Sequence, residues 1–152
     1  MFKQAILEKI RSYDVEKLRI QYDSHPYYGK IDIPSFLPEQ VTEQCANELE
    51  NLPLKLGKKF TRKGSAMWEY NNLTNTPIQE QLVNVLHSSE FISWVEKVSG
   101  VDRLIPDPHL IGSGYMKSFA GDTLKVHTDF NWVEELHLHR AVSIIIYFKA
   151  EK

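Results

Sequence analysis

The sequence has 152 residues, of which 42% are hydrophobic and 25% are charged, and its formal net charge is −2. One globular domain with a hydrophobic core is therefore expected, and the slight acidity gives no bulk attraction to nucleic acid or to an anionic membrane surface. The single cysteine, Cys45, cannot form an internal disulfide, and no apolar run approaches the roughly 20 residues that a membrane-spanning helix needs. We therefore expect a cytoplasmic protein in which Cys45 is a small core residue.

The first half of the chain is predicted to be mostly helical. Phe2, Ile6 and Ile10 recur every four residues, which places them on one face of a helix. A second helix is expected to begin at Asp14, because aspartate is a good N-cap residue. A short strand is predicted by Ile31, Ile33 and Phe36, which are apolar and β-branched or aromatic.

Three further helices are predicted from their terminal residues. Pro38 suits the first turn of a helix. Thr76 and Gln79 have the spacing of a capping box at the start of the next helix. Another helix is expected from Ser89, and Gly100 is a natural terminator for it.

The second half of the chain has the character of strands. Residues 110–119 and 123–129 are predicted to form two strands joined by a turn at 120–122. Residues 140–149 are rich in β-branched and aromatic side chains, which favours a buried strand. Helices followed by strands indicate an α+β fold in which helices pack on a sheet.

The stretch 123–129 contains the most informative chemistry. Alternate residues of a strand face the same side, so His127 and Asp129 should point together while Leu124 and Val126 face away. An imidazole and a carboxylate two residues apart supply two of the three ligands of a 2-His-1-carboxylate iron site. Spacing alone, however, favours an ordinary surface pair near a strand end.

The surrounding residues resemble a known family. The glycine-rich stretch 111–121 leads into Gly-Asp-Thr-Leu-x-x-His-x-Asp-Phe-Asn at 121–131, and Arg140 precedes an apolar run that ends in Tyr147-Phe148. This pattern is similar to that of the 2-oxoglutarate/Fe(II)-dependent oxygenase superfamily, in its prolyl-4-hydroxylase-like branch. The resemblance covers roughly residues 30–152 and is strongest after Leu110.

The resemblance implies a fold and a domain organisation. The expected architecture is α+β, with N-terminal helices packed on a double-stranded β-helix (a jelly roll) that is incomplete in this chain. Residues 1–30 would form an N-terminal helical segment, and residues 31–152 would form the oxygenase domain, truncated before its distal strands.

The resemblance also implies an activity, hydroxylation of a substrate coupled to conversion of 2-oxoglutarate and O2 to succinate. His127 and Asp129 would bind Fe(II), and Tyr147 and, with a weaker match, Tyr115 would contact 2-oxoglutarate. Ascorbate is an additional cofactor that such enzymes can use. The substrate, a small molecule or a prolyl or other protein side chain, stays open, and neither nucleic acid nor a membrane is expected as a partner.

The sequence departs from the family in the ligands that should follow. The second iron-binding histidine and the basic residue for 2-oxoglutarate belong on later strands, and the sequence ends at Lys152. His137 and His139 stand at positions that are loop residues in relatives, so we do not expect either to substitute. We therefore expect a truncated product or one piece of a split chain, with an open sheet edge through which it could associate.

Two other classes of function stay in view. A non-catalytic jelly-roll remnant, acting at most as a binding module, is favoured by the absent distal ligands, whereas the intact local motif favours an enzyme. A cupin-like metal hydrolase or isomerase would need further His or Glu ligands. A cluster of basic residues, Lys55, Lys58, Lys59, Arg62 and Lys63, is interpreted as a solvated loop, although it could guide an anionic substrate toward the site.

Overall fold

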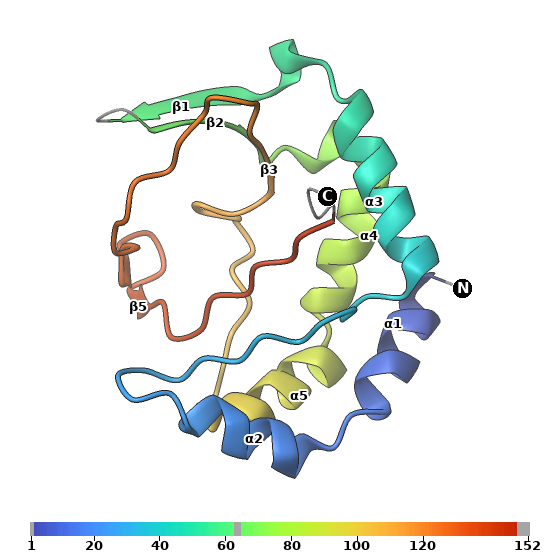
Figure 1. The fold of residues 1–152 in the computed structure, drawn as a ribbon, viewed down its shortest axis with the longest axis vertical. Coiled ribbons are helices and arrows are strands. Elements are labelled where there is room, and N and C mark those ends of the chain that lie inside the picture. The colour runs from blue at the N-terminus through green and yellow to red at the C-terminus, as the bar shows by residue number, and fades with distance from the viewer. Residues whose placement is uncertain (1, 63–64, 149–152) are drawn as a thin grey trace.

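The chain has a helical side and a side made of short strands and long irregular segments (Figure 1). In the computed structural model, which describes residues 2–62 and 65–148, the helices are α1 (Phe2–Arg11), α2 (Val15–Asp23), α3 (Glu39–Asn51), α4 (Pro77–Leu86) and α5 (Ser89–Ser99). Two short 3-10 helices, η1 (Leu54–Leu56) and η2 (Leu73–Asn75), flank the first two strands. None of these helices has the length and apolarity needed to cross a bilayer.

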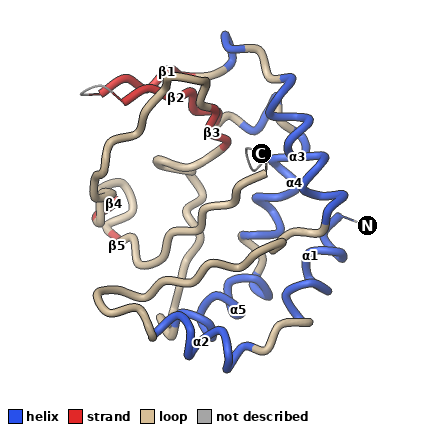
Figure 2. Tube along the Cα trace, viewed as in Figure 1, coloured by secondary structure: helices blue, strands red, loops and turns tan. Residues whose placement is uncertain are grey.

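The strands form two separate antiparallel sheets. The larger sheet has the order β1 (Lys58–Arg62), β2 (Ser65–Tyr70), β3 (Tyr115–Lys117), and the smaller one pairs β4 (Trp132–Val133) with β5 (Leu138–His139). The predicted α+β class is therefore confirmed, but the described residues form no closed barrel. Most of the chain after α5 is irregular, as the tan segments in Figure 2 show.

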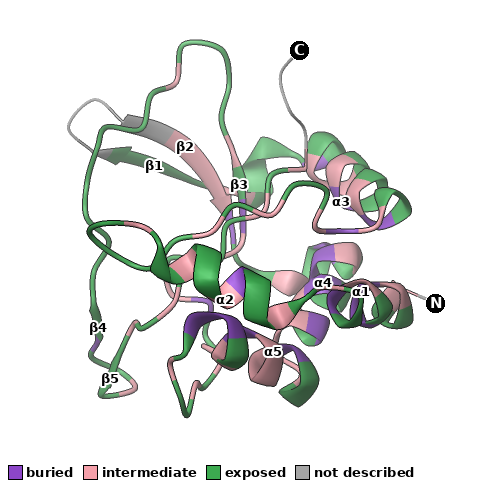
Figure 3. Cartoon of the chain, turned by 60° about the horizontal axis from the view of Figure 1, so that its bottom comes forward, coloured by how far each residue is buried: buried purple, intermediate pink, exposed green. Residues whose placement is uncertain are grey.

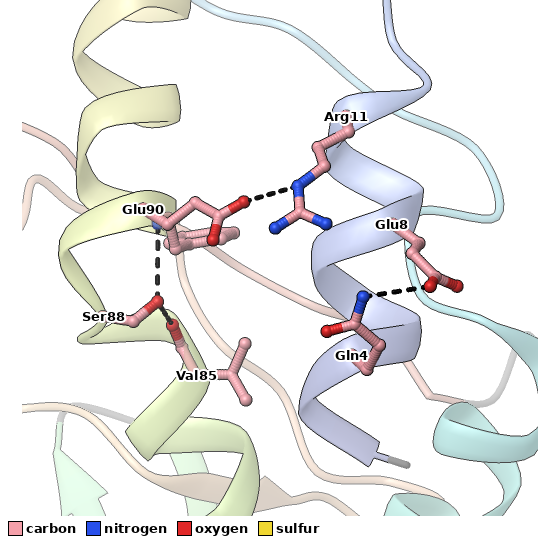
Figure 4. A network of polar contacts seen from close by, with 7 residues as sticks. Gln4, Glu8, Arg11, Val85, Ser88 and Glu90 are labelled. Carbon is pink, nitrogen blue, oxygen red and sulfur yellow. Dashed lines mark hydrogen bonds and ion pairs between the residues drawn. The ribbon is translucent and has the colours of Figure 1, made fainter.

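The helices bury the faces that their sequence periodicity predicted. In α1, Ile6 and Ile10 are fully or almost fully buried, and α1 packs against both α4 and α5. Arg11 of α1 donates from Nε to a carboxylate oxygen of Glu90 in α5 at 2.7 Å (Figure 4). Cys45 is completely buried, as expected of a core residue.

Of the caps predicted at Asp14, Gly100 and Thr76, the first two are confirmed. The side chain of Asp14 accepts a hydrogen bond from the Lys17 amide and caps α2. Gly100 ends α5 in the left-handed conformation, with φ of 67°. The capping box predicted at Thr76 and Gln79 is wrong, because the Thr76 hydroxyl instead donates to the Gln79 side chain at 2.8 Å.

A carboxylate from another helix caps α4 instead. The two side-chain oxygens of Glu48 in α3 accept hydrogen bonds from the Ile78 and Gln79 amides, both at 2.8 Å. The Gln79 side chain turns toward the sheet and donates to the Tyr70 carbonyl at 3.0 Å. This arrangement ties α3, α4 and the end of β2 together around the N-terminus of α4.

Most of the basic cluster is not a loop, which corrects the sequence-based interpretation, and its last member, Lys63, lies outside the described residues. Residues 58–62 form β1, which pairs antiparallel with β2, and Phe60 lies opposite Met67. The local signal was present in the β-favouring residues Phe60, Thr61, Trp68 and Tyr70 on either side of a glycine. The many lysines in this stretch led to its interpretation as a loop, although charged side chains are common on the edge of a sheet.

The strands predicted elsewhere are shorter than expected or do not form. Within 110–119 only Tyr115–Lys117 is a strand, and residues 31–36, 123–129 and 140–148 belong to no strand of the sheets that the described residues form. Residue 149 lies outside the described residues. A strand needs a neighbour for its backbone N–H and C=O groups, and local sequence carries no information about whether one is present.

The core lies between the helices and reaches the sheet through two tyrosines. Its buried members are Ile6, Leu7, Ile10, Leu37, Val41, Cys45, Leu52, Tyr70, Leu82, Val85, Phe91, Val95 and Tyr115. The segment 140–148 returns to this core, where Val142, Ile146 and Phe148 pack against it. The segment that precedes β4 is almost entirely exposed, as Figure 3 shows in green.

Candidate functional site

The predicted metal ligands lie in the exposed segment between β3 and β4. The structure brings His127 and Asp129 together, with 3.3 Å between Nε2 of the imidazole and Oδ1 of the carboxylate. About half of each side chain is exposed. These two side chains therefore point toward one another as predicted, although no strand forms here and Val126 is fully exposed.

The backbone sets the orientation of the His127 ring. Nδ1 lies 2.8 Å from the carbonyl oxygen of Lys125. A carbonyl oxygen only accepts hydrogen bonds, so Nδ1 carries the proton and donates it. In the neutral ring Nε2 then has a free lone pair, and that lone pair faces the Asp129 carboxylate. Such a contact is favourable only when a proton or a metal ion lies between the two atoms.

Arg140 holds the other oxygen of Asp129. Its Nη1 lies 3.3 Å from Oδ2, while its Nη2 donates to the Ile111 carbonyl at 2.8 Å. The guanidinium also stacks on the Phe130 ring, with 3.9 Å from Cζ to the ring centroid. Sequence reasoning marked Arg140 as part of the family pattern but did not assign it a contact, because its partner Ile111 lies 29 residues earlier.

The two predicted 2-oxoglutarate ligands lie in different places. Tyr115 is 3% exposed in the core and its ring meets Phe148 edge-on, with centroids 5.5 Å apart. Burial, with added contributions from Cys45 and Glu48, raises the pKa of Tyr115 above its usual range. Tyr147 is 83% exposed and lines a groove together with Lys30. The structure records no contact of either tyrosine with His127 or Asp129 among the described residues.

That groove has a volume of about 1340 Å³. Its walls are the two extended segments 28–39 and 141–147, and its floor includes Phe91, Trp94 and Val95 of α5. Ile144 and Ile145 expose 48% and 72% of their surfaces. The groove is built from different residues than those of the His127–Asp129 pair.

The nearby histidines make other contacts. His139 lies in β5, and its ring meets the Trp132 ring of β4 with centroids 5.0 Å apart. The His137 ring also meets the Trp132 ring edge-on, with centroids 6.2 Å apart. Within residues 2–62 and 65–148, no three His, Cys, Asp or Glu side chains are grouped so that they could hold a metal ion together. The described site is therefore a two-ligand pair.

Comparisons with known proteins give no relative. No family model, no curated protein and no solved structure matches the chain.

Proposed function

We propose that this chain supplies the His-x-Asp part of an iron(II) centre in a 2-oxoglutarate-dependent oxygenase of the prolyl-4-hydroxylase-like branch. The observation that carries the proposal is the 3.3 Å separation of His127 Nε2 and Asp129 Oδ1. Ligand bonds of about 2.1 Å that enclose an angle between those of an octahedron and a tetrahedron place two donor atoms about 3.0–3.4 Å apart. The pair therefore has the spacing of two neighbouring ligands of one divalent metal.

The donor chemistry supports the same proposal. Nδ1 of His127 is held as the donor to Lys125, which leaves Nε2 as the ligand atom, and a ligating histidine is commonly oriented in this way by its other nitrogen. The carboxylate offsets part of the charge of the cation. Half-exposure of both side chains leaves room for further ligands from a cosubstrate, water or another segment.

The bound iron would supply the activation of O2 and, with 2-oxoglutarate, the oxidation of a substrate C–H bond. His127 and Asp129 would hold the metal, and Tyr147 and Tyr115 are the residues proposed for 2-oxoglutarate. For these tyrosines the support is the family resemblance alone. The substrate would be a small molecule or a prolyl or other protein side chain.

A jelly roll is part of this proposal. The segments 31–36, 123–129 and 140–148 have the composition of strands, although none of them is a strand in the part of the chain that the structure describes. Strands added beside them would complete a sheet over the helices. The distal histidine and the basic residue for 2-oxoglutarate would then come from those strands.

A non-catalytic binding module is the second candidate. The observation that favours it is the two-ligand site, because the described residues provide no third metal-binding side chain beside His127 and Asp129. In this case the groove between 28–39 and 141–147 would be the binding feature, and metal affinity would be negligible.

An anaerobic titration separates the two candidates. Fe(II) is added to the protein with and without 2-oxoglutarate, and the visible charge-transfer band of the ternary complex is followed. The oxygenase proposal predicts saturable Fe(II) binding that Asp129→Ala abolishes, and a charge-transfer band would show that the site is assembled without the distal histidine. A protein that gives no saturable iron binding would contradict the oxygenase proposal and favour the binding module.

A further inference from the structure

The Arg140 side chain is largely buried and makes several contacts, although it lies next to the half-exposed His127–Asp129 pair. Its side chain is 19% exposed, whereas Asp129 is 53% exposed. The backbone amide of Arg140 donates to the Asn131 carbonyl at 2.9 Å, which places the residue beside the His127–Asp129 segment. The guanidinium then lies between the Asp129 carboxylate, the Ile111 carbonyl and the Phe130 ring.

The planar guanidinium uses a separate nitrogen for each polar partner. Nη1 faces Asp129 Oδ2 at 3.3 Å and Nη2 donates to the Ile111 carbonyl at 2.8 Å. The Phe130 ring covers one face of the plane at 3.9 Å. A lysine ammonium has no such fork and stacks less well, so it cannot satisfy these three contacts together.

Gly112 makes room for this arrangement. A Cβ at Gly112 would lie 2.9 Å from Phe130 Cε1 and 3.3 Å from Arg140 Nη2. Its φ of 64° is also in the region that side chains rarely adopt. The loop after Leu110 thus contributes in two ways. The Ile111 carbonyl accepts a hydrogen bond from the guanidinium, and the missing side chain of Gly112 leaves space for it.

The consequence concerns the two oxygens of Asp129. Oδ2 is directed to Arg140, and Oδ1 is directed to His127 Nε2. If the carboxylate rotated freely, it could turn away from the imidazole or chelate a cation through both oxygens. Because Arg140 holds Oδ2, only Oδ1 of Asp129 lies beside His127 Nε2. Oδ1 is then in the position of the second of two neighbouring ligands of one metal ion.

We propose that Arg140, supported by the Ile111–Gly112 backbone and the Phe130 ring, is a positioning residue that makes Asp129 a one-oxygen metal ligand beside His127. This inference rests on the proposed metal-binding function of the pair. Outer-shell partners of this kind change metal affinity by roughly 10–100-fold when they are removed. A role limited to folding would change thermal stability and leave the metal affinity of the folded protein unchanged.

The test compares Mn(II) affinity with a direct readout of the guanidinium. The variants are Arg140→Lys, Arg140→Gln, Gly112→Ala and Phe130→Leu, and Arg19→Lys is the matched control. Arg19 also pairs with an aspartate, with 2.7 Å between its Nε and Asp23 Oδ2, but on the distant helix α2. Mn(II) binding is measured by electron paramagnetic resonance, and the Cδ protons of Arg140 are followed by NMR in the metal-free protein.

The expected result has two parts. In the metal-free protein the Arg140 protons shift upfield because of the Phe130 ring, and Gly112→Ala and Phe130→Leu remove that shift. Arg140→Lys and Arg140→Gln each weaken Mn(II) binding about 10-fold or more, whereas Arg19→Lys leaves it unchanged. Arg140→Lys is the decisive variant, because it keeps the positive charge but loses the two-nitrogen geometry and the stacking of the guanidinium.

Other results overturn the inference and identify which part is wrong. An unshifted Arg140 in the metal-free protein means that the guanidinium is not held on Phe130. If the wild-type protein binds Mn(II) and Asp129→Ala abolishes binding, equal affinity of the Arg140 variants refutes the positioning role alone. If the wild-type protein binds no Mn(II), both the proposed function and the role of Arg140 fail.

Discussion

Glu48 and Gln79 connect two helices at the point where α4 begins. One carboxylate oxygen of Glu48 accepts the Gln79 amide and the other accepts the Ile78 amide, each at 2.8 Å. The first amides of a helix have no partner within the helix, and a negative charge there also interacts favourably with the helix dipole. Glu48 therefore stabilises the start of α4 from the neighbouring helix α3.

Replacing Glu48 with alanine should destabilise the fold by about 1–2 kcal/mol, the usual cost of a lost N-cap. Urea denaturation followed by circular dichroism measures the free energy of unfolding. Glu50→Ala, at an exposed position of the same helix, is the control and should change it by less than about 0.5 kcal/mol. Equal effects of the two substitutions would show that the Glu48 contacts do not contribute.

Stability should fall at alkaline pH because three buried groups resist losing their protons. Burial raises the pKa of Cys45, Tyr70 and Tyr115. In the unfolded chain thiols and phenols lose their protons near pH 8.5 and pH 10, respectively, so above about these values the unfolded state binds fewer protons than the folded state. The free energy of unfolding therefore decreases as pH rises, by at most about 1.4 kcal/mol per pH unit for each group.

The substitution Tyr115→Phe isolates one of these groups. It should make the slope between pH 10 and about pH 11 shallower by approximately the contribution of one phenol. Tyr27→Phe, at a site that is 88% exposed, is the control and should leave the slope as in the wild type. Urea unfolding at a series of pH values provides the measurement, and a Tyr115→Phe slope equal to that of the wild type would contradict the prediction.

The close approach of the Gly114 backbone to β2 predicts a large effect of a single methyl group. A Cβ at Gly114 would lie 2.5 Å from the Tyr70 carbonyl oxygen, whereas a Cβ at Gly121 would meet nothing within 4 Å. Both glycines have positive φ, 122° and 91°. Gly121→Ala should therefore cost about 1 kcal/mol from backbone strain alone, and Gly114→Ala should cost at least about 2 kcal/mol because β2 and β3 must also separate. Thermal unfolding of the two variants checks the difference, and equal losses would refute the close contact.

The helices were predictable from sequence because their signals are local. Asp14 and Gly100 directly adjoin the helices that they cap, and the four-residue spacing of α1 lies within that helix. It was not predictable that residues 123–129 and 140–148 form no strand within the described part of the chain, since strand formation depends on partners elsewhere in the fold. The same distinction applies to the site. The His127–Asp129 contact follows from their two-residue spacing, but the contact of Arg140 with Ile111 joins residues 29 positions apart.

The exposed extended segments predict self-association. Ile145 is 72% exposed on an extended segment that belongs to no sheet among the described residues, and Ile20 is 71% exposed on helix α2, where the backbone is hydrogen-bonded within the helix. An edge of this kind can pair with another chain, whereas a helix surface cannot. Ile145→Lys should therefore reduce the apparent mass in analytical ultracentrifugation, and Ile20→Lys should leave it unchanged. A monomeric wild-type protein, or equal effects of the two variants, would contradict this prediction.

The central claim is that His127 and Asp129 bind one divalent metal ion, and Mn(II) binding measured by electron paramagnetic resonance tests it most directly. The account predicts a saturable site in the wild-type protein and a loss of affinity of at least about 100-fold in His127→Ala and in Asp129→Ala, beyond the effect of an outer-shell partner. Asp102→Ala and His109→Ala, at exposed positions outside the site, should bind as the wild type does. Non-saturable binding, or equal affinity in all five proteins, would contradict the account.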